Sequence, residues 1–272
     1  MHKTLQQLKK YFQAYPYHIV ETSPWPILMS FSVGAMMIGA VLYFNYIPFG
    51  GLYLTLGALC TTWVFYFWFT DIITEGTYLG HHTLTVQKGL TIGVSFFILT
   101  ERFFFLTIFW AYFHSSLAPT PELGSVWPPR GIEALNPFAV PLLNTALLLS
   151  SGAAVTLGHH AFIMLKREIS LNGTLLCIIL AVLFTRCQRI EYDSAGFTIA
   201  DGVYGSCFYF GTGFHGFHVI IGTLFIGVAL YRIWSYQMTS THHTGLETSI
   251  LYWHFVDVVW LFLYISVYWW GS

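Results

Sequence analysis

Residues 22–70 contain no Asp, Glu, Lys or Arg. A membrane-crossing helix needs about 20 predominantly apolar residues, so an uncharged stretch of this length holds more than one crossing. The sequence Pro-Phe-Gly-Gly at 48–51 interrupts the stretch, because proline and paired glycines end helices and form turns. We therefore predict two membrane helices joined by a short turn.

The composition extends this prediction to the whole chain. Of its 272 residues, 56% are hydrophobic and 8% are charged, whereas a soluble domain carries about 25% charged residues. The low charge excludes an ordinary soluble enzyme, and the high hydrophobicity excludes a disordered chain. The formal net charge of -1 provides no basic surface for nucleic acid. A polytopic membrane protein without a nucleic-acid partner is therefore predicted.

The apolar segments predict an all-α fold with seven transmembrane helices. They lie at about residues 26–45, 51–76, 86–116, 139–165, 171–193, 202–237 and 246–270. The long connection at 117–138 contains five prolines and is predicted to form a rigid surface loop rather than a helix. We predict a single domain over residues 1–272, with an N-terminal segment at 1–25 and the seven helices within 26–270.

Lys and Arg residues indicate the orientation of the chain. On the side of the N-terminus lie Lys3, Lys9, Lys10, Lys88, Lys166, Arg167 and Arg232, and the opposite side has Arg130, Arg186 and Arg189. Basic residues collect on the cytoplasmic side of a membrane protein, so we expect the N-terminus in the cytoplasm or the mitochondrial matrix. Seven crossings place the C-terminus on the other side. The first residues lack the apolar region of a secretory signal.

Glu101 is the most unusual polar residue in a predicted span, because phenylalanines surround it in the sequence. Ionisable residues inside a bilayer are costly and need a partner or a function. The sequence leaves two roles open, a proton-handling or headgroup-contacting carboxyl and a structural hydrogen bond to another helix. The adjacent Arg102 points about 100° away on a helix. We expect it to meet an acid on another helix or a lipid headgroup.

Two pairs of polar residues occur at a spacing of three in the later helices. His254 and Asp257 share a helix face, and we interpret them as a hydrogen bond that holds two helices together, with a proton relay as the alternative. His215 and His218 lie in a glycine-rich helix, where histidine can hydrogen-bond to a closely packed neighbour. Two histidines alone do not complete a metal site, so a structural role is favoured.

Three histidine doublets lie near the ends of predicted helices on the N-terminal side. They are His81–His82, His159–His160 and His242–His243. A copper or haem cluster is one interpretation, and contacts to lipid phosphates or helix ends are the favoured one. Near the same side, Asp71, Glu75, His82 and Arg232 suggest a pocket for a lipid headgroup, with a solvated helix end that binds no ligand as the alternative. The four cysteines form no CxxC pair, so neither a disulfide framework nor a thiolate metal site is predicted.

Several long motifs resemble one family. They are PYHIVETSPWPI near the start, FWAYFHSSLAPTPELGSVWPP at 109–129, VPLLNT at 140–145, DGVYGSCFYFGTGFHGFHVIIGT at 201–223 and YWHFVDVVWLFLYISVYWWGS at 252–272. Together they resemble subunit III of the mitochondrial cytochrome c oxidase over essentially the whole chain.

The resemblance implies a fold, an assembly and a location. It implies seven helices in a two-plus-five arrangement around a lipid-filled, V-shaped cleft, in a non-redox subunit that stabilises the catalytic core and supports proton uptake and oxygen access. It implies phospholipids in the cleft but no haem, copper or other metal on this chain, since haem and copper belong to partner subunits I and II. Small accessory subunits and respiratory supercomplexes are further implied partners. The location is the mitochondrial inner membrane, with the N-terminus in the matrix and the C-terminus in the intermembrane space.

The resemblance also implies roles for particular residues. Glu101 matches the family's carbodiimide-reactive carboxyl, which implies a part in proton supply. The lipid-cleft positions match Glu75, His82, Trp110, His114 and Arg232. The chain departs from the family pattern at Thr74, Arg102, Arg186 and Arg189.

Two other functional classes are alternatives on the residues alone. A self-contained intramembrane enzyme or bis-histidine haem protein would show bound haem or metal in the purified chain. A transporter or seven-helix receptor would need a polar, substrate-sized cavity near the middle of the membrane.

Overall fold

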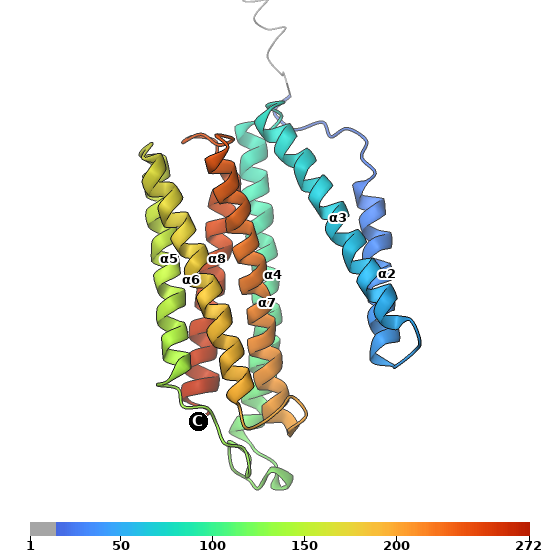
Figure 1. Cartoon of the computed structure of the whole chain (residues 1–272), viewed down its shortest axis with the longest axis vertical. Helices are drawn as coiled ribbons and strands as arrows, with labels where there is room; N and C mark the ends of the chain where they lie inside the picture. The colour runs from blue at the N-terminus through green and yellow to red at the C-terminus, as the bar shows by residue number, and fades with distance from the viewer. Residues whose placement is uncertain (1–14) are drawn as a thin grey trace, which may run out of the picture. The chain divides into compact units, whose positions relative to one another are not determined.

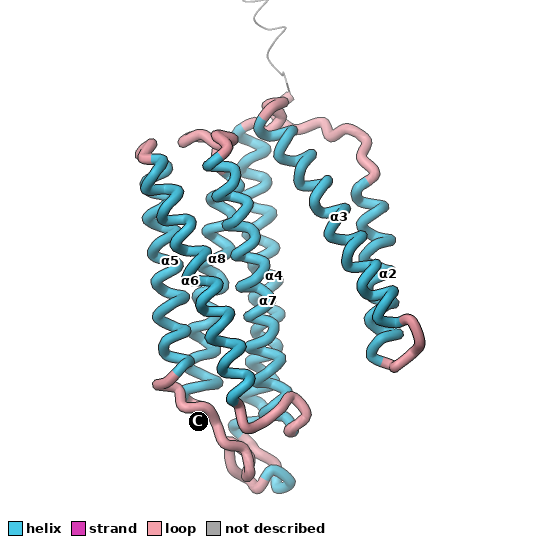
Figure 2. Tube along the Cα trace, in the orientation of Figure 1, coloured by secondary structure: helices cyan, strands magenta, loops and turns pink. Residues whose placement is uncertain are grey.

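In the computed structural model, residues 15–272 are described and form helices joined by loops (Figure 1). The helices are α2 (Trp25–Phe44), α3 (Gly50–Thr77), α4 (Leu84–Leu117), α5 (Val140–Ile163), α6 (Arg167–Ser194), α7 (Gly202–Trp234) and α8 (Thr244–Leu263). The short 3-10 helix η1 (Pro121–Leu123) lies in a loop, and the π-helix η2 (Tyr264–Trp269) continues α8. Figure 2 shows no strand in this part of the chain.

Seven of these helices, with η2 counted as the end of α8, are long and apolar enough to cross a membrane. The prediction of an all-α protein with seven transmembrane helices is therefore confirmed for residues 15–272. Of the predicted N-terminal segment at 1–25, residues 1–14 lie outside the described part of the chain.

The helix ends differ most from the prediction where α6 begins and α7 ends. The sequence predicted a start at 171, but α6 begins at Arg167. The Arg167 guanidinium donates a hydrogen bond to the Trp234 carbonyl over 2.8 Å and lies 4.1 Å from the centre of the Tyr236 ring. The predicted end at 237 was wrong as well, because Tyr236 has a φ of 55° and the chain turns after Trp234.

The described chain divides into two compact units between Gly89 and Leu90. In the first unit, α2 and α3 pack closely against each other. The backbones approach because Gly39 and Gly57 have no side chain at the contact: a Cβ on Gly57 would lie 2.6 Å from the Met36 backbone nitrogen. The Trp25 indole also donates a hydrogen bond to the Asp71 carboxylate on α3. The division into two helices plus five, and a single domain over 1–272, stay predictions.

The second unit, called the helix bundle below, contains α5 to α8 and most of α4. Its core includes Trp253 and Trp260 on α8, whose side chains are no more than 1% exposed. Each indole nitrogen donates a 2.9 Å hydrogen bond to α5, from Trp253 to Ser151 and from Trp260 to Thr145. Burying an unpaired N–H is costly. These two small hydroxyl residues therefore allow the large rings to pack inside the bundle.

The predicted proline-rich loop connects α4 and α5. Trp127 in this loop packs against Tyr204 and donates a 3.3 Å hydrogen bond to the Tyr112 hydroxyl on α4. These contacts attach the loop to the end of the helix bundle.

Candidate functional site

Glu101 on α4 lies beside His218 on α7. The distance from Glu101 Oε2 to His218 Nε2 is 3.0 Å. The other ring nitrogen, Nδ1, lies 2.8 Å from the Phe214 carbonyl. Because a carbonyl oxygen only accepts hydrogen bonds, Nδ1 carries a hydrogen. The 3.0 Å separation of Nε2 and the carboxyl then fits a hydrogen bond, whose proton either the acid or the imidazole can carry. The geometry of the pair is therefore compatible with one shared proton.

Aromatic rings surround this pair. The His218 ring lies 5.2 Å from the Phe105 ring and 4.5 Å from the Phe214 ring, and it stacks against Tyr252 at 6.1 Å. His218 is 4% exposed, so the proton lies in a region of low dielectric constant, where a hydrogen bond is stronger than in water. Sequence reasoning identified both residues but did not pair them, because helix contacts between residues 117 positions apart leave no pattern in one sequence.

Two further sets of polar contacts occur in the helix bundle. His215 Nε2 is 3.2 Å from the Val256 carbonyl of α8. His254 Nδ1 is 3.4 Å from Asp257 Oδ2, and the His254 Nε2 atom is 3.1 Å from the Thr156 hydroxyl of α5. The His215 and Thr156 contacts join different helices, whereas the His254–Asp257 contact lies within α8, so the set suits a structural role.

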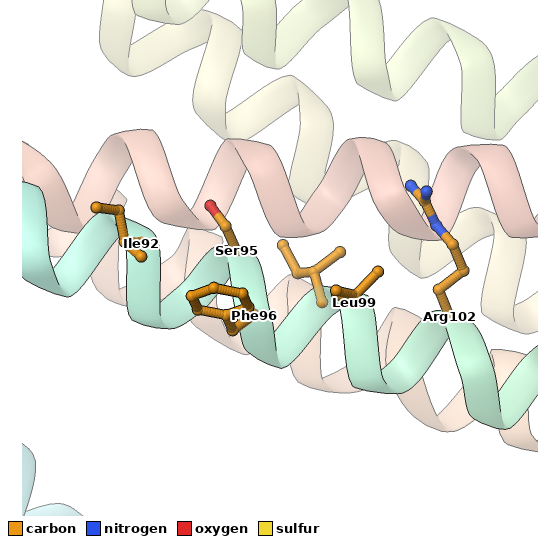
Figure 3. A pocket seen from close by; sticks show the side chains of 6 residues that line it. Ile92, Ser95, Phe96, Leu99 and Arg102 are labelled. Atoms are coloured by element: carbon orange, nitrogen blue, oxygen red, sulfur yellow. The ribbon is translucent and has the colours of Figure 1, made fainter.

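Arg102 points away from Glu101 and lies on the exposed side of α4. Figure 3 shows its guanidinium at one end of a row of side chains along this helix. They line a shallow groove of about 310 Å³, formed by Ile92, Ser95, Phe96, Ile98, Leu99 and Arg102. No ion pair joins Arg102 to an acid within residues 15–272. The groove therefore has an apolar wall and a cationic end. This combination suits a ligand with a hydrocarbon chain and an anionic headgroup.

A second groove of about 440 Å³ lies between α4 and α7. Phe104, Ile108 and Phe210 are among the residues that line it. Its wall is almost entirely apolar, so it suits a hydrocarbon chain rather than a charged group.

The predicted lipid-binding residues divide between the two units. In the first unit, Glu75 Oε2 lies 3.9 Å from His18 Nδ1, and His18 Nε2 lies 3.1 Å from His81 Nδ1. The His82 ring packs against Gly76. Sequence reasoning did not include His18, because a lone histidine before the first helix carries no spacing signal.

In the second unit, the predicted lipid-binding residues lie at two ends of the helix bundle. Trp110 and His114 are one turn apart near the end of α4, and both are exposed. Arg232 lies in the last turn of α7, at the opposite end (Figure 1), with its guanidinium against Gly245. Within this unit, Trp110 and His114 therefore lie far from Arg232, and the lipid-binding role of all five residues stays a prediction.

Glu191 is a buried acid that the sequence analysis did not single out. It is 1% exposed at the end of α6, where it accepts hydrogen bonds from the Tyr268 hydroxyl and, over 3.2 Å, from Gln188 Nε2. The Gln188 side-chain oxygen accepts a 3.3 Å bond from Asn144. This network joins α5, α6 and η2, and it lies inside the protein although Glu191 is close in sequence to a charged helix end.

Two groups of side chains bring three potential metal ligands within 4.8 Å of one another. They are His18, Glu75 and His82 in the first unit, and His159, His243 and Glu247 in the second. Next to the second group, His242 lies in the loop between α7 and α8, where partial burial and the nearby Arg232 charge lower its pKa. The remaining histidine of the doublets, His160, is exposed at the end of α5.

Comparison with known proteins matches the chain to one family. The family model described as "Cytochrome c oxidase subunit III" matches residues 15–272. A protein of Mycosarcoma maydis named "Cytochrome c oxidase subunit 3" is 60% identical over 266 residues, covering 96% of this chain and 97% of the relative. Proteins of the same name from Podospora anserina and Yarrowia lipolytica are each 56% identical, and each alignment covers 97% of this chain and 98% of the relative.

Proposed function

The chain belongs to the cytochrome c oxidase subunit III family, and from this we propose what its own residues do in the oxidase. As a member of this family it is a subunit of complex IV, a multi-pass membrane protein that works with the other subunits of the complex. We propose that it stabilises the catalytic core, binds phospholipids and supports proton uptake. Two-plus-five packing around a lipid-filled cleft, and a contribution to oxygen access, belong to the same proposal.

The proposal extends to the surroundings of the chain. Haem and copper lie in partner subunits I and II, small accessory subunits and supercomplex partners surround them, and this chain contributes no redox centre. The N-terminus faces the matrix and the C-terminus the intermembrane space, in agreement with the excess of basic residues on the N-terminal side.

The proton role is supported by the 3.0 Å contact between the Glu101 carboxyl and His218 Nε2, across which a proton can be shared. An acid–imidazole pair holds a proton and releases it at low cost, since either partner can carry it. Its position between α4 and α7, with the Glu101 side chain 23% exposed, leaves one side of the pair accessible from outside this chain.

Replacing Glu101 with glutamine tests this role in the purified oxidase. An amide keeps the shape and the hydrogen bond to His218 but cannot release a proton. We expect the number of turnovers before inactivation to fall by about tenfold, with unchanged haem spectra. Glu168→Gln, an exposed acid at the start of α6, is the matched control. Wild-type endurance and proton stoichiometry in Glu101→Gln would contradict the proton role.

The lipid role is supported by the two grooves along α4. We propose that Arg102 contacts an anionic phospholipid headgroup while the apolar groove wall contacts an acyl chain. This is also where the chain departs from the family pattern, so the contact is expected to be particular to this chain and its similar relatives.

Replacing Arg102 with alanine is expected to weaken this lipid contact by about tenfold, because a hydrogen bond to a charged group contributes roughly 1.5–3 kcal/mol. The measurement is the anionic phospholipid content of the purified oxidase, by mass spectrometry after detergent washing. Arg189→Ala removes an exposed arginine that pairs with Asp193 on α6 and is the control. Unchanged lipid content and turnover in Arg102→Ala would show that Arg102 does not bind lipid.

A further inference from the structure

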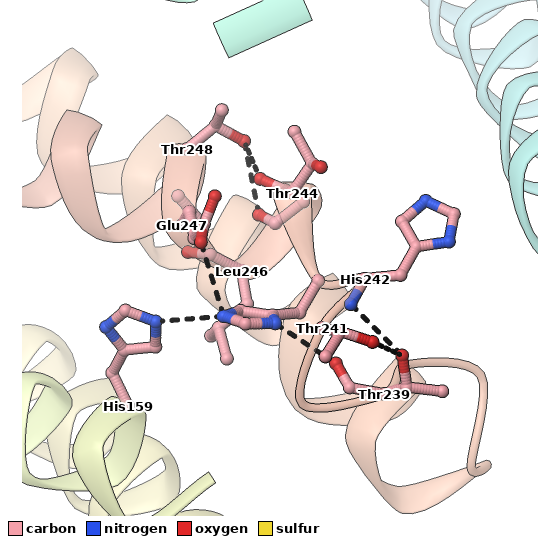
Figure 4. A network of polar contacts seen from close by, with 11 residues as sticks. His159, Thr239, Thr241, His242, Thr244, Leu246, Glu247 and Thr248 are labelled. Atoms are coloured by element: carbon pink, nitrogen blue, oxygen red, sulfur yellow. Dashed lines mark hydrogen bonds and ion pairs between the residues drawn. The ribbon is translucent and has the colours of Figure 1, made fainter. Parts of the chain in front are cut away.

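The end of α5 and the start of α8 bring together three side chains that have no role in the proposed function. They are His159 from α5, His243 immediately before α8, and Glu247 one turn later (Figure 4). We propose that these residues bind a divalent transition-metal cation of the zinc type. The resemblance implied no metal on this chain, so the proposal departs from that implication and is independent of the proton and lipid roles.

The distances between the ligand atoms suit a tetrahedral cation. His159 Nε2 lies 3.2 Å from His243 Nε2, which lies 3.3 Å from Glu247 Oε1. Ligands about 2.0–2.1 Å from a tetrahedral zinc ion are about 3.3 Å from each other. All three atoms lie within 4.8 Å of one another. A cation therefore fits among them with only small side-chain rotations.

The hydrogen bonding of His243 leaves the lone pair of its Nε2 atom directed toward the other two ligands. Its Nδ1 atom lies 3.0 Å from the Thr239 carbonyl, which accepts a hydrogen bond and so requires the proton on Nδ1. In the neutral ring, the Nε2 lone pair then faces the Glu247 carboxylate, 3.3 Å away. Two electron-rich atoms at this distance repel each other unless a cation or a proton lies between them.

The same hydrogen bond orients the ligand as in known metal sites. Metal-binding histidines commonly donate their second ring N–H to a backbone carbonyl, which fixes the ring and raises its basicity. His243 is 7% exposed, so packing also holds its ring. The Glu247 side chain is 47% exposed, which leaves an open direction for the ion to enter and for water as a fourth ligand.

The ligand types favour zinc over a hard cation. Two imidazole nitrogens and one carboxylate suit zinc, copper and nickel, whereas calcium and magnesium prefer oxygen ligands. The other group, around Glu75, is the weaker candidate. Its His18 Nδ1 atom lies 3.9 Å from the Glu75 carboxylate, and its His18 Nε2 atom is in contact with His81.

The test uses the assembled oxidase, treated with a chelator and then titrated with zinc ions. Zinc per haem is measured by mass spectrometry after removal of unbound metal. We expect the wild-type complex to bind one zinc ion more than Glu247→Gln at limiting zinc, and the dissociation constant of this ion to rise at least about tenfold in the variant. Glu247 is partly exposed, so its replacement by glutamine preserves assembly. Subunit content verifies this.

His160→Gln and His242→Gln are the matched controls, because each changes a histidine next to a proposed ligand. Both are expected to retain the additional zinc ion, whereas His159→Gln loses it. Equal zinc content and affinity in wild type, Glu247→Gln and His159→Gln would overturn the proposal. In that case the three ligand atoms share a proton instead of a metal.

Discussion

Replacing Trp253 with alanine should lower the free energy of unfolding of the helix bundle by about 3–5 kcal/mol, the usual cost of removing a large aromatic side chain from a core. Trp253 is completely buried, and its ring packs against the α7 backbone at Gly222, where a Cβ would lie 2.9 Å from the ring. The substitution also removes the donor to the Ser151 hydroxyl. Lipid does not refill such a cavity, because the surrounding helices close it from all sides.

The measurement is the midpoint temperature at which this subunit dissociates from the purified oxidase. Trp234→Ala, at the end of α7 with 62% of its side chain exposed, is the control and should shift the midpoint little. Trp253→Phe should lie between the two, since it keeps most of the ring but loses the hydrogen bond to Ser151. An equal shift in Trp253→Ala and Trp234→Ala would show that burial of Trp253 does not stabilise the bundle.

Hydropathy predicted the seven helices well because the signal is local. Each span is a run of apolar residues between charged or proline-containing segments, and a bilayer requires such runs. The ends of the helices were harder to predict from the sequence, because they depend on contacts with other parts of the chain. Arg167 lengthens α6 through its bond to Trp234, a residue 67 positions away that the local sequence does not reveal.

The candidate proton site shows the same limit. Composition alone identified Glu101 as an unusual residue, and the helical spacing separated it from Arg102. Its partner His218 was assigned only a general structural role, since facing positions on α4 and α7 follow from the tertiary fold. The histidine doublets show the same limit of sequence-based prediction, because only the fold places His159 next to His243.

The close packing of α2 on α3 leads to the second large effect. Gly39→Ala should destabilise this helix pair by about 1–3 kcal/mol, the usual cost of overpacking. A Cβ at Gly39 would lie 2.7 Å from the Leu54 Cα atom, well inside van der Waals distance. Because the obstructing atoms belong to the backbone, no side-chain rotation relieves the contact and the two helices must separate. Small residues at such positions are what allow membrane helices to pack closely.

Gly34→Ala is the matched control on the same helix, since a Cβ there has no atom within 4 Å. Alanine is favoured over glycine within a helix by about 1 kcal/mol, so this variant should be as stable as the wild type or more stable. Protease accessibility of the α2–α3 turn in the assembled oxidase measures the difference. We expect faster cleavage in Gly39→Ala and an unchanged rate in Gly34→Ala. Equal rates would contradict the close contact at Gly39, because both substitutions add the same methyl group to the same helix and differ only in what it meets.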